Sequence, residues 1–469
     1  MKILQREGLS QSLLHIPRTA RGSIMKTLSS RLFAALLLAF TAIALHAQSA
    51  PSVLDVKAAK LPDSWYILHA GTLMADASKP VAKQVSVIVK NDKIDSIKPG
   101  YVDAASLGVA PPAIVQVIDL KDKFVMAGLI DAHTHIANGN LVSALRISRE
   151  KILSGVTTAR DAGSTPELIF PLRDAIAQSL AYGPRILASG APISTTGGHG
   201  DFRNGNFLAS LAPPAFSTGI CDGEDNCRMK VREQIQLGAD QIKIMATAGV
   251  ADDSDTGLEQ QFSDAELKVI IETAHLMKRK VMAHAIGQEG IKAAVRAGVD
   301  SIEHGIYLDD EGAKMMKEKG VYLDATLTAL DDVVNLLHEG SPALSQNTKN
   351  KILRMPDEKP GVLGRQVRLA QKYGVKMAVG TDFGGTLGGE MVILVQKCGV
   401  PALDVLKADT LGNADLLSIS DKVGTLEPGK SADIVAFNGS PIDDITLTTK
   451  PSFVMGMGHE YVAPGFKLP

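Results

Sequence analysis

The chain has 469 residues, which is enough for two or three ordinary domains or for one large barrel with an additional domain. A hydrophobic content of 45% and a charged content of 21% are typical of a packed globular protein and exclude a disordered or fibrous chain. Lys and Arg number 49 against 51 Asp and Glu, giving a net charge of −2. This balance argues against nucleic-acid binding, which favours a basic chain.

The first 47 residues predict an N-terminal extension that ends in a signal peptide. After Met25 come the basic residues Lys26 and Arg31, an apolar run over 32–45 and then small residues, with cleavage expected after Ala47. The apolar run is shorter than the roughly 20 residues that span a bilayer. We therefore expect an exported protein, periplasmic or secreted, with no membrane attachment once the signal is removed.

Both ends of the remaining chain have the texture of short strands. Residues 64–74, 84–99 and 114–122 alternate apolar and polar side chains, and an Asn-Asp turn divides the second segment into a hairpin. Residues 431–438 and 451–462 resemble them. We predict one small β-sandwich domain assembled from residues 52–123 and 421–469.

The middle of the chain, residues 124–420, alternates short apolar strands with helical stretches. Helical periodicity is clear over 264–279 and 364–374. Such alternation predicts parallel β-α-β units, and eight strands in this length match a closed (β/α)8 TIM barrel. The alternative is a doubly wound open sheet, although no Gly-rich phosphate loop follows the first strand. The expected strands are 124–136, 157–163, 185–190, 241–249, 281–287, 301–306, 322–327 and 377–384.

The expected export of the protein affects which roles its three cysteines can have. Cys221 and Cys227 lie six residues apart in a polar segment, and an oxidising compartment favours a disulfide between them. Metal binding is the rival interpretation, but no second Cys/His pair lies nearby at zinc-finger spacing. We expect Cys398 to be buried as a small apolar residue.

Six residues capable of binding metals fall at the carboxyl ends of the expected strands, where barrel enzymes build their active sites. Each alone has an ordinary interpretation as a hydrogen-bonded polar residue, and a buried lysine can pair with a carboxylate. Together they form one pattern, because neutral imidazole and carboxylate are common ligands of divalent metals. The six are His133, His135, Lys243, His284, His304 and Asp382.

These motifs resemble the metal-dependent amidohydrolase superfamily, in its branch of Xaa-Pro dipeptidases, imidazolonepropionase-like proteins and secreted carboxypeptidase-like, ochratoxin-hydrolysing enzymes. The resemblance is carried by GLIDAHTH, QIKIMATAG, AHAIG, SIEHG and GTDFGG. One departure is Ala127, where the family usually has proline. The resemblance implies a homo-oligomer and two divalent metals, usually zinc. His133, His135 and Asp382 would hold one metal and His284 and His304 the other, with a carbamylated Lys243 and a hydroxide as bridges.

That site predicts hydrolysis, with Asp382 moving a proton from the hydroxide to the leaving nitrogen. We expect His199, in a Gly-rich insertion over 191–223, and Tyr307 to contact substrate. Structuring the loop and packing against the next helix are their respective alternatives. An ion pair between Arg160 and Asp161 is expected to support the site.

The expected reaction is hydrolysis of an amide bond next to a carboxylate-bearing amino acid. The substrate would be a small molecule: an Xaa-Pro dipeptide or an N-acyl amino acid, ochratoxin-type N-acyl-phenylalanine included. The alternative on the same fold is a cyclic amide or amidine hydrolase or a deaminase, and Lys243 argues for the binuclear enzymes. A binding protein without catalysis would have lost a ligand, and all six residues are present.

Overall fold

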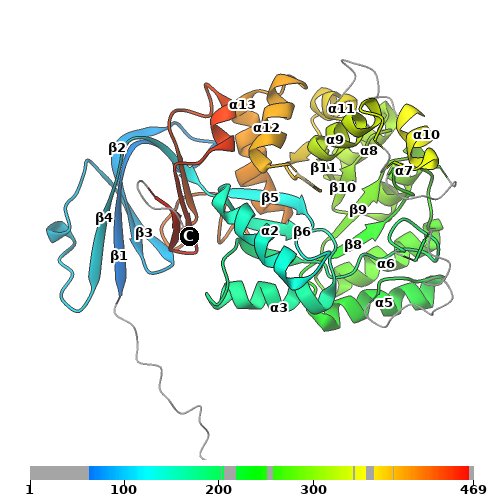
Figure 1. Ribbon diagram of the computed structural model, residues 1–469, viewed down its shortest axis with the longest axis horizontal. Helices are drawn as coiled ribbons and strands as arrows, with labels where there is room; N and C mark the ends of the chain where they lie inside the picture. Colours follow the sequence, from blue (N-terminus) through cyan, green and yellow to red (C-terminus); the bar gives the residue numbers. More distant parts are fainter. Residues whose placement is uncertain are drawn as a thin grey trace, which may run out of the picture. The chain divides into compact units, whose positions relative to one another are not determined.

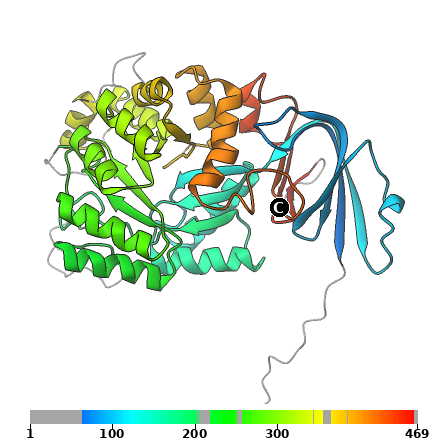
Figure 2. The ribbon, with the colours of Figure 1, turned by 180° about the vertical axis from the view of Figure 1, so that it is seen from behind.

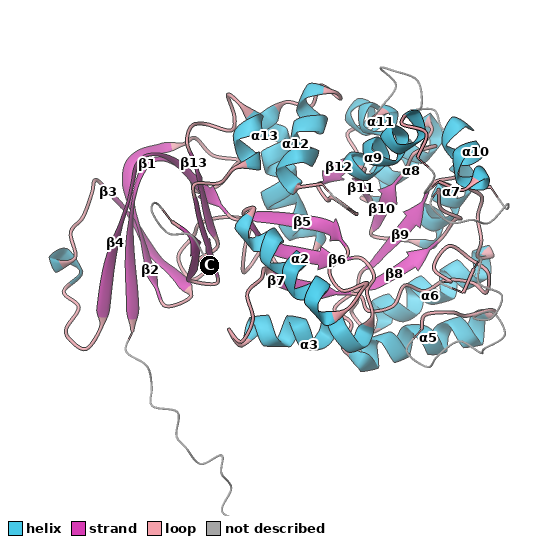
Figure 3. Ribbon diagram, in the orientation of Figure 1, coloured by secondary structure: helices cyan, strands magenta, loops and turns pink. Residues whose placement is uncertain are grey.

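The computed structural model of the chain describes residues 63–201, 203–204, 218–250, 257–341, 344–354, 364–383 and 385–463 (Figure 1). The expected extension and signal peptide over residues 1–47 lie outside the described residues. Within the described ranges, no helix is long and apolar enough to cross a membrane. The strands fall into two groups, a small sheet and a larger set accompanied by helices (Figure 3).

The small sheet combines strands from both ends of the chain. It has seven strands in the described part, in the order β15-β14-β13-β4-β1-β2-β3. The central strand β4 runs parallel to β1 and antiparallel to β13. The bounds are β1 (Ser64–Met74), β2 (Ala82–Lys90), β3 (Lys93–Pro99), β4 (Ile114–Ala127), β13 (Ile434–Phe437), β14 (Phe453–Gly456) and β15 (His459–Val462).

The two ends of this sheet meet around one apolar core. The Ile94 amide donates to the Lys430 carbonyl at 2.9 Å and the Ala432 amide to the Asp92 carbonyl at 2.8 Å, so β3 lies against the segment that precedes β13. Leu68 and Phe453, from opposite ends of the chain, are both fully buried in that core. The prediction of a small β domain built from both chain ends is confirmed.

The second group of strands forms a barrel. Its eight described strands run parallel within two sheets, β5-β6-β7 and β8-β9-β10-β11-β12. Parallel bridges between Ile193 and Ile244 and between Thr134 and Asp382 join the two sheets at both seams. The bounds are β5 (Leu129–Thr134), β6 (Val156–Asp161), β7 (Arg185–Ala188), β8 (Ile242–Met245), β9 (Val281–Ala285), β10 (Ser301–His304), β11 (Tyr322–Asp324) and β12 (Lys376–Ala378). The predicted TIM barrel is confirmed, and the open sheet is excluded.

A buried asparagine completes the seam between the first and last barrel strands. The Asn413 amide nitrogen donates to the Ile130 and Val379 carbonyls at 2.6 and 2.9 Å, and its oxygen accepts from the Val379 amide at 3.1 Å. A side-chain amide carries the same donor and acceptor groups as a peptide. Asn413 therefore adds to the backbone hydrogen bonds at this seam, where the Ala132 amide also donates to the Val379 carbonyl at 3.0 Å.

Helices accompany the barrel strands in both views (Figures 1 and 2). Their ends follow local signals: Ser263 and Glu266 form a capping box on α6, and the helix expected over 364–374 lies between two glycines in left-handed conformation. The bounds are α2 (Leu141–Leu153), α3 (Pro166–Ala177), α5 (Glu224–Leu237), α6 (Asp264–Leu276), α7 (Gln288–Ala297), α8 (Asp310–Lys319), α9 (Leu327–His338), α10 (Gln346–Arg354), α11 (Arg365–Tyr373), α12 (Leu387–Gln396), α13 (Ala402–Lys407) and α14 (Asn413–Leu416), with single turns η1 (Ala105–Leu107), η2 (Ala408–Gly412) and η3 (Ile445–Thr449).

The small sheet and the barrel meet at Gly128. The expected first barrel strand began at residue 124, but residues 124–127 pair with β1 and β13 and belong to the small sheet. A Cβ at Gly128 would lie 2.2 Å from the Thr157 hydroxyl, so only glycine allows β5 to turn into the barrel beside β6. Arg185 ties the two parts together, because its guanidinium lies 2.5 Å from the Asp433 carboxylate.

Candidate active site

A cavity of about 670 Å³ opens at the carboxyl ends of the barrel strands. All six residues expected as metal ligands line it, from strands or strand ends of β5, β8, β9, β10 and β12. We call these residues the cavity floor: His133, His135, Lys243, His284, His304 and Asp382. The sequence predicted that these residues lie at one end of the barrel, and in the structure their side chains also lie close to one another.

The floor residues contact one another closely. Asp382 Oδ1 lies 3.1 Å from His135 Nε2 and 3.5 Å from His133 Nε2, and Lys243 Nζ lies 3.4 Å from His133 Nε2. The rings of His284 and His304 have centroids 4.7 Å apart. His133, His304 and Asp382 each offer one donor atom within 4.8 Å of the other two. Four imidazoles, a carboxylate and a primary amine therefore converge.

Burial keeps three of the floor imidazoles neutral, those of His133, His284 and His304. It lowers the pKa of His133 to about 4 and that of His304 to about 3, and the pKa of His284 also lies well below its usual value. Burial likewise lowers the pKa of the Lys243 amine to about 8. Neutral imidazoles keep a nitrogen lone pair for a ligand. This donor set fits a divalent metal site.

Hydrogen bonds behind the rings orient those lone pairs. His135 Nδ1 lies 2.6 Å from the Gly163 carbonyl, and His133 Nδ1 lies 2.7 Å from Glu303 Oε2. A carbonyl and a carboxylate oxygen can only accept, so both Nδ1 atoms donate, and each Nε2 points into the cavity on the side of Asp382. The tautomer is therefore fixed by groups outside the cavity.

Two floor residues adopt a strained backbone. His304 and Asp382 have φ angles of 70° and 62°, in the left-handed region that non-glycine residues rarely enter. Asp382 is held there by its amide, which donates to the His133 carbonyl at 2.7 Å. Such conformations persist where the surrounding structure enforces them, and they cluster at active sites.

Beneath the floor lies a buried ionic network that the sequence analysis missed. Arg160 lies 3.0 Å from Glu303 and 3.8 Å from Asp324, inside the barrel. The expected Arg160–Asp161 ion pair is wrong, because neighbouring residues of a strand point to opposite faces. Asp161 instead accepts from the Ile136 amide at 2.8 Å and from the Ser164 hydroxyl at 2.7 Å.

In this network one charged carboxylate pairs with the one guanidinium. Burial would raise the pKa of the Glu303 carboxyl, but Arg160 and His133 lower it below its usual range. Burial and the neighbouring Glu303 raise the pKa of Asp324 well above its usual value, and neither of its carboxyl oxygens has a hydrogen-bond partner among the described residues. One carboxylate thus pairs with Arg160 and supports His133. The charged residues within the apolar strands SIEH and YLD were the available sequence signal.

Of the two expected substrate contacts, the structure brings one to the cavity. The His199 ring lines the cavity, with its centroid 4.3 Å from that of His284, and it approaches so closely that a Cβ at Gly249 would lie 2.0 Å from it. Tyr307 lies outside the described cavity lining, because its hydroxyl donates to the Arg354 carbonyl at 2.6 Å. This hydrogen bond joins Tyr307 to the end of α10, and not to α8, the next helix in the chain, which the alternative given above named.

Two further segments line the cavity beside the floor residues, and we call them the loop wall and the helix wall. The loop wall is the segment 192–204, which contributes Pro192, His199, Asp201 and Asn204. The helix wall is α9, which lines the cavity with four apolar side chains and one carboxyl group: Ala329, Leu330, Asp332, Val333 and Leu336. Phe383 adds an exposed ring stacked on His135 at 4.4 Å.

The start of helix α9 is hydrogen-bonded to a floor residue on one side and to helix α12 on the other. Thr326, just before the helix, lies 2.6 Å from His304 Nδ1 through its hydroxyl. The buried Glu390 accepts from the amides of Leu327 and Thr328 at 2.8 and 2.7 Å, which satisfies helix N-terminal donors. Burial raises the pKa of this carboxyl to about 7. The helix wall therefore starts at a fixed point beside the floor.

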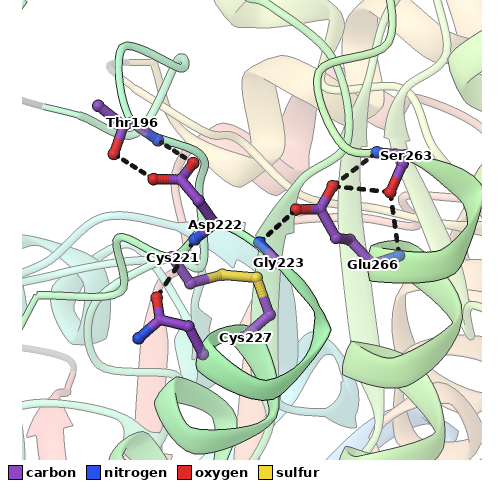
Figure 4. Close-up of a disulfide and its surroundings, with 8 residues drawn as sticks. Thr196, Cys221, Asp222, Gly223, Cys227, Ser263 and Glu266 are labelled. Carbon is purple, nitrogen blue, oxygen red and sulfur yellow. Dashed lines mark hydrogen bonds between the residues drawn. A yellow bond between two sulfur atoms is a disulfide. The ribbon is translucent and has the colours of Figure 1, made fainter.

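The predicted disulfide is present. Cys221 and Cys227 are bonded across the start of α5, with Cα atoms 4.9 Å apart (Figure 4). This excludes the metal-binding interpretation of the pair. Cys398 is buried, as expected.

Comparison with known proteins identifies the family. The model of the Amidohydrolase family matches residues 124–459. The chain belongs to this family. It is 32% identical over 422 residues to ochratoxinase of Aspergillus niger, covering 83% of this chain and 84% of that protein. It is also 25% identical over 384 residues to imidazolonepropionase of Fusobacterium nucleatum, covering 75% and 84% of the two chains.

A solved structure extends the similarity to the whole fold. A Xaa-Pro dipeptidase with methionine bound in its active site superposes with a TM-score of 0.78 at 32% identity, covering 85% of this chain and 100% of that chain. These relatives match the branch expected from the motifs. The amidohydrolase is therefore a hydrolase that acts on amide bonds, and its barrel mouth contains a possible metal-binding site.

Proposed function

We propose that this amidohydrolase is a binuclear metal-dependent enzyme that hydrolyses the amide bond between an apolar acyl group and a carboxylate-bearing amino acid. Xaa-Pro dipeptides and N-acyl amino acids, including ochratoxin-type N-acyl-phenylalanine, fall in this class. The observation that carries the proposal is the convergence of four imidazoles, a buried lysine and a carboxylate on one cavity floor.

The floor residues divide into two ligand sets. His133, His135 and Asp382 would hold one ion and His284 and His304 the other, with a carbamylated Lys243 between them; zinc is the expected metal. When bound, the ions supply Lewis acidity, which lowers the pKa of a water ligand and polarises the scissile carbonyl. Lys243 is 1% exposed and lies 3.4 Å from His133, so its side chain is held at the centre of the floor.

Asp382 is the residue placed to move the proton. Its carboxylate lies at the floor beside His133 and His135, and burial alone would raise its pKa, but His133 and its neighbours hold the pKa well below its usual range. In the proposed reaction it accepts the proton of the attacking water and delivers it to the leaving nitrogen. An amide nitrogen leaves poorly without a proton, so this transfer is required.

The walls support the assignment of the two substrate halves. The apolar side chains of α9 extend from Ala329 to Leu336, about 10 Å at the rise of an α-helix, and suit an apolar acyl group, with Asp332 as one carboxyl group among them. On the loop wall, His199 offers a ring nitrogen for hydrogen bonding to the polar half. Tyr307 is not assigned a contact with substrate, because its hydroxyl is already bonded to Arg354.

Export and assembly remain predictions. The signal peptide and a homo-oligomeric state are not tested by the described residues. N-terminal sequencing of exported protein would check cleavage after Ala47, and sedimentation velocity would check the oligomer.

The test of the proposed function is elemental analysis beside activity. Wild-type protein should contain about two divalent ions per chain and hydrolyse members of an N-acyl amino acid and Xaa-Pro panel. Lys243→Ala should bind one ion or none and lose hydrolysis. Lys268→Ala, at an exposed position on α6, is the matched control and should resemble wild type.

One ion per chain, unchanged by Lys243→Ala, would refute the bridge. The deaminase and cyclic amide or amidine alternative would then take its place, and the panel should change to those substrates. Retention of hydrolysis after complete chelation would refute metal dependence itself.

A further inference from the structure

The loop wall is hydrogen-bonded to a second segment of the same loop. The chain leaves β7, passes through the loop wall and returns through residues 218–223 to α5. The Ser194 amide donates to the Gly219 carbonyl at 3.1 Å, and the Cys221 amide donates to the Ser194 carbonyl at 2.9 Å. A Cβ at Gly219 would lie 2.0 Å from the Pro192 carbonyl oxygen, so the two segments are in close contact.

A carboxylate extends this pairing toward His199. Asp222 accepts from the Thr196 amide at 3.1 Å and from the Thr196 hydroxyl at 2.6 Å (Figure 4). Thr196 lies three residues before His199, and the intervening turn is closed by the Gly198 amide, which donates to the Thr195 carbonyl at 2.9 Å. Asp222 is therefore connected to the turn before His199 by a short, hydrogen-bonded path, and the His199 amide also donates to Gln261 Oε1 at 2.9 Å.

Asp222 is itself fixed from both sides. Cys221, its neighbour, is bonded covalently to Cys227 in α5. Gly223, its other neighbour, donates its amide to Glu266 at 2.6 Å, and Glu266 also caps α6. Figure 4 shows Asp222 beside Thr196, the disulfide below Asp222, and Glu266 beside Gly223 on the other side. The Asp222 amide also donates to Asn226 Oδ1 at 3.2 Å, so the anchors are one covalent bond and two hydrogen bonds, one of them charge-assisted.

We propose that the Cys221–Cys227 disulfide is a positioning element for substrate binding. It holds Asp222 where its carboxylate bonds Thr196, and Thr196 in turn seats the His199 ring at the cavity. The inference rests on the proposed role of His199 in binding substrate. Cys221, Cys227 and Asp222 touch neither the floor nor the substrate, so they act only through the loop.

The first test removes the covalent bond. The double variant Cys221→Ser/Cys227→Ser should raise KM for an N-acyl amino acid by about tenfold and leave kcat within about twofold. Asp222→Asn should act in the same direction with a smaller increase. Asp225→Asn, three residues along at an exposed position, is the control and should match wild type.

Reduction of folded wild-type protein gives the same comparison if the double variant fails to fold. A phosphine reductant should raise KM in wild type, and Cys398→Ala, which keeps the disulfide, should respond in the same way and controls for Cys398. Hydrogen exchange over residues 192–201 should accelerate in both the reduced protein and the double variant. This readout needs no substrate, so it distinguishes failure of the clamp from failure of the proposed function.

A double-mutant cycle decides whether the effect passes through His199. In a His199→Ala background, breaking the disulfide should change KM by less than about twofold. A tenfold change that persists in that background would overturn the inference, as would unchanged hydrogen exchange over 192–201. Loss of bound metal in the double variant would also overturn it, because the effect would then lie at the floor.

Discussion

The floor and the walls of the cavity are built by different means. Floor residues lie at or just beyond barrel strand ends, and His133 and His135 have their rear nitrogens held by Glu303 and a backbone carbonyl. The walls are a loop and a helix, each attached through a buried or clamped carboxylate, Asp222 or Glu390. The proposed catalytic residues thus lie at the ends of the barrel strands. The proposed substrate-binding residues lie on a loop and a helix that a few hydrogen bonds hold in place.

This difference predicts that floor substitutions abolish turnover for every substrate, whereas wall substitutions change affinity, stability or substrate preference. The largest expected effect is at Asp382. Asp382→Asn should lower kcat by about 10⁴-fold for all substrates, because the amide cannot accept the proton of the attacking water. Steady-state kinetics on short and long acyl substrates would show this. Asp310→Asn, an exposed carboxylate on α8, is the control. Loss restricted to one substrate would place Asp382 among the wall residues.

The attachment of the helix wall should appear as pH-dependent stability. The pKa of Glu390 is about 7 in the fold against an ordinary 4.5, so the folded state binds the extra proton between those values. Stability should therefore fall as pH rises from 4.5 to 7, by about 3 kcal/mol at most. Urea unfolding of wild type and Glu390→Gln measures it. Parallel pH profiles for the two proteins would contradict this assignment.

Substitutions in the buried ionic network beneath the floor should have smaller effects than substitutions of the floor residues themselves. Glu303→Gln weakens the acceptor for His133 Nδ1 and leaves Arg160 without its carboxylate partner. Metal affinity should fall by about 10- to 100-fold, as for other groups that orient metal ligands. Competition with a chromogenic chelator measures this affinity, with Glu311→Gln on the exposed face of α8 as the control. Equal affinities would mean that His133 is oriented by its neighbours in the cavity instead.

The smallest effect is expected on the helix wall and should depend on substrate. Val333→Asp adds a second carboxyl group beside Asp332, in place of an apolar side chain that lines the cavity, and should lower kcat/KM for an N-octanoyl amino acid by about tenfold. The N-acetyl compound, which reaches less of the wall, should be hydrolysed as by wild type. Asn335→Asp lies outside the described cavity lining and is the control. Equal losses for both substrates would show that α9 supports the floor and not the acyl group.

The same contrast explains what the sequence could predict. The strand motifs revealed the floor, because the carboxyl ends of parallel strands must meet at one end of a barrel. The disulfide followed from spacing and compartment. The position of His199 at the cavity could be anticipated from the insertion after the third barrel strand, although its contact with His284 depends on Gly249.

The remaining errors have physical causes. Tyr307 follows His304 closely in the chain, but the turn after β10 carries it to α10. Arg160 and Asp161 are adjacent and opposite in charge, yet strand geometry separates them, and the true partner Glu303 lies 143 residues away. The apolar residues of α9 cover more than one face, so periodicity alone does not show which of them line the cavity.

The placement of β4 also has a consequence for synthesis of the chain. Residues 124–127 pair with β1 on one side and with β13 on the other, and β13 is made about 300 residues later. At ribosomal rates of roughly 5–20 residues per second, this apolar edge waits about 15–60 s for its partner. An open strand edge is a template for association with other chains. Until the last strands emerge, this edge of the nascent chain is therefore open to pairing with other chains.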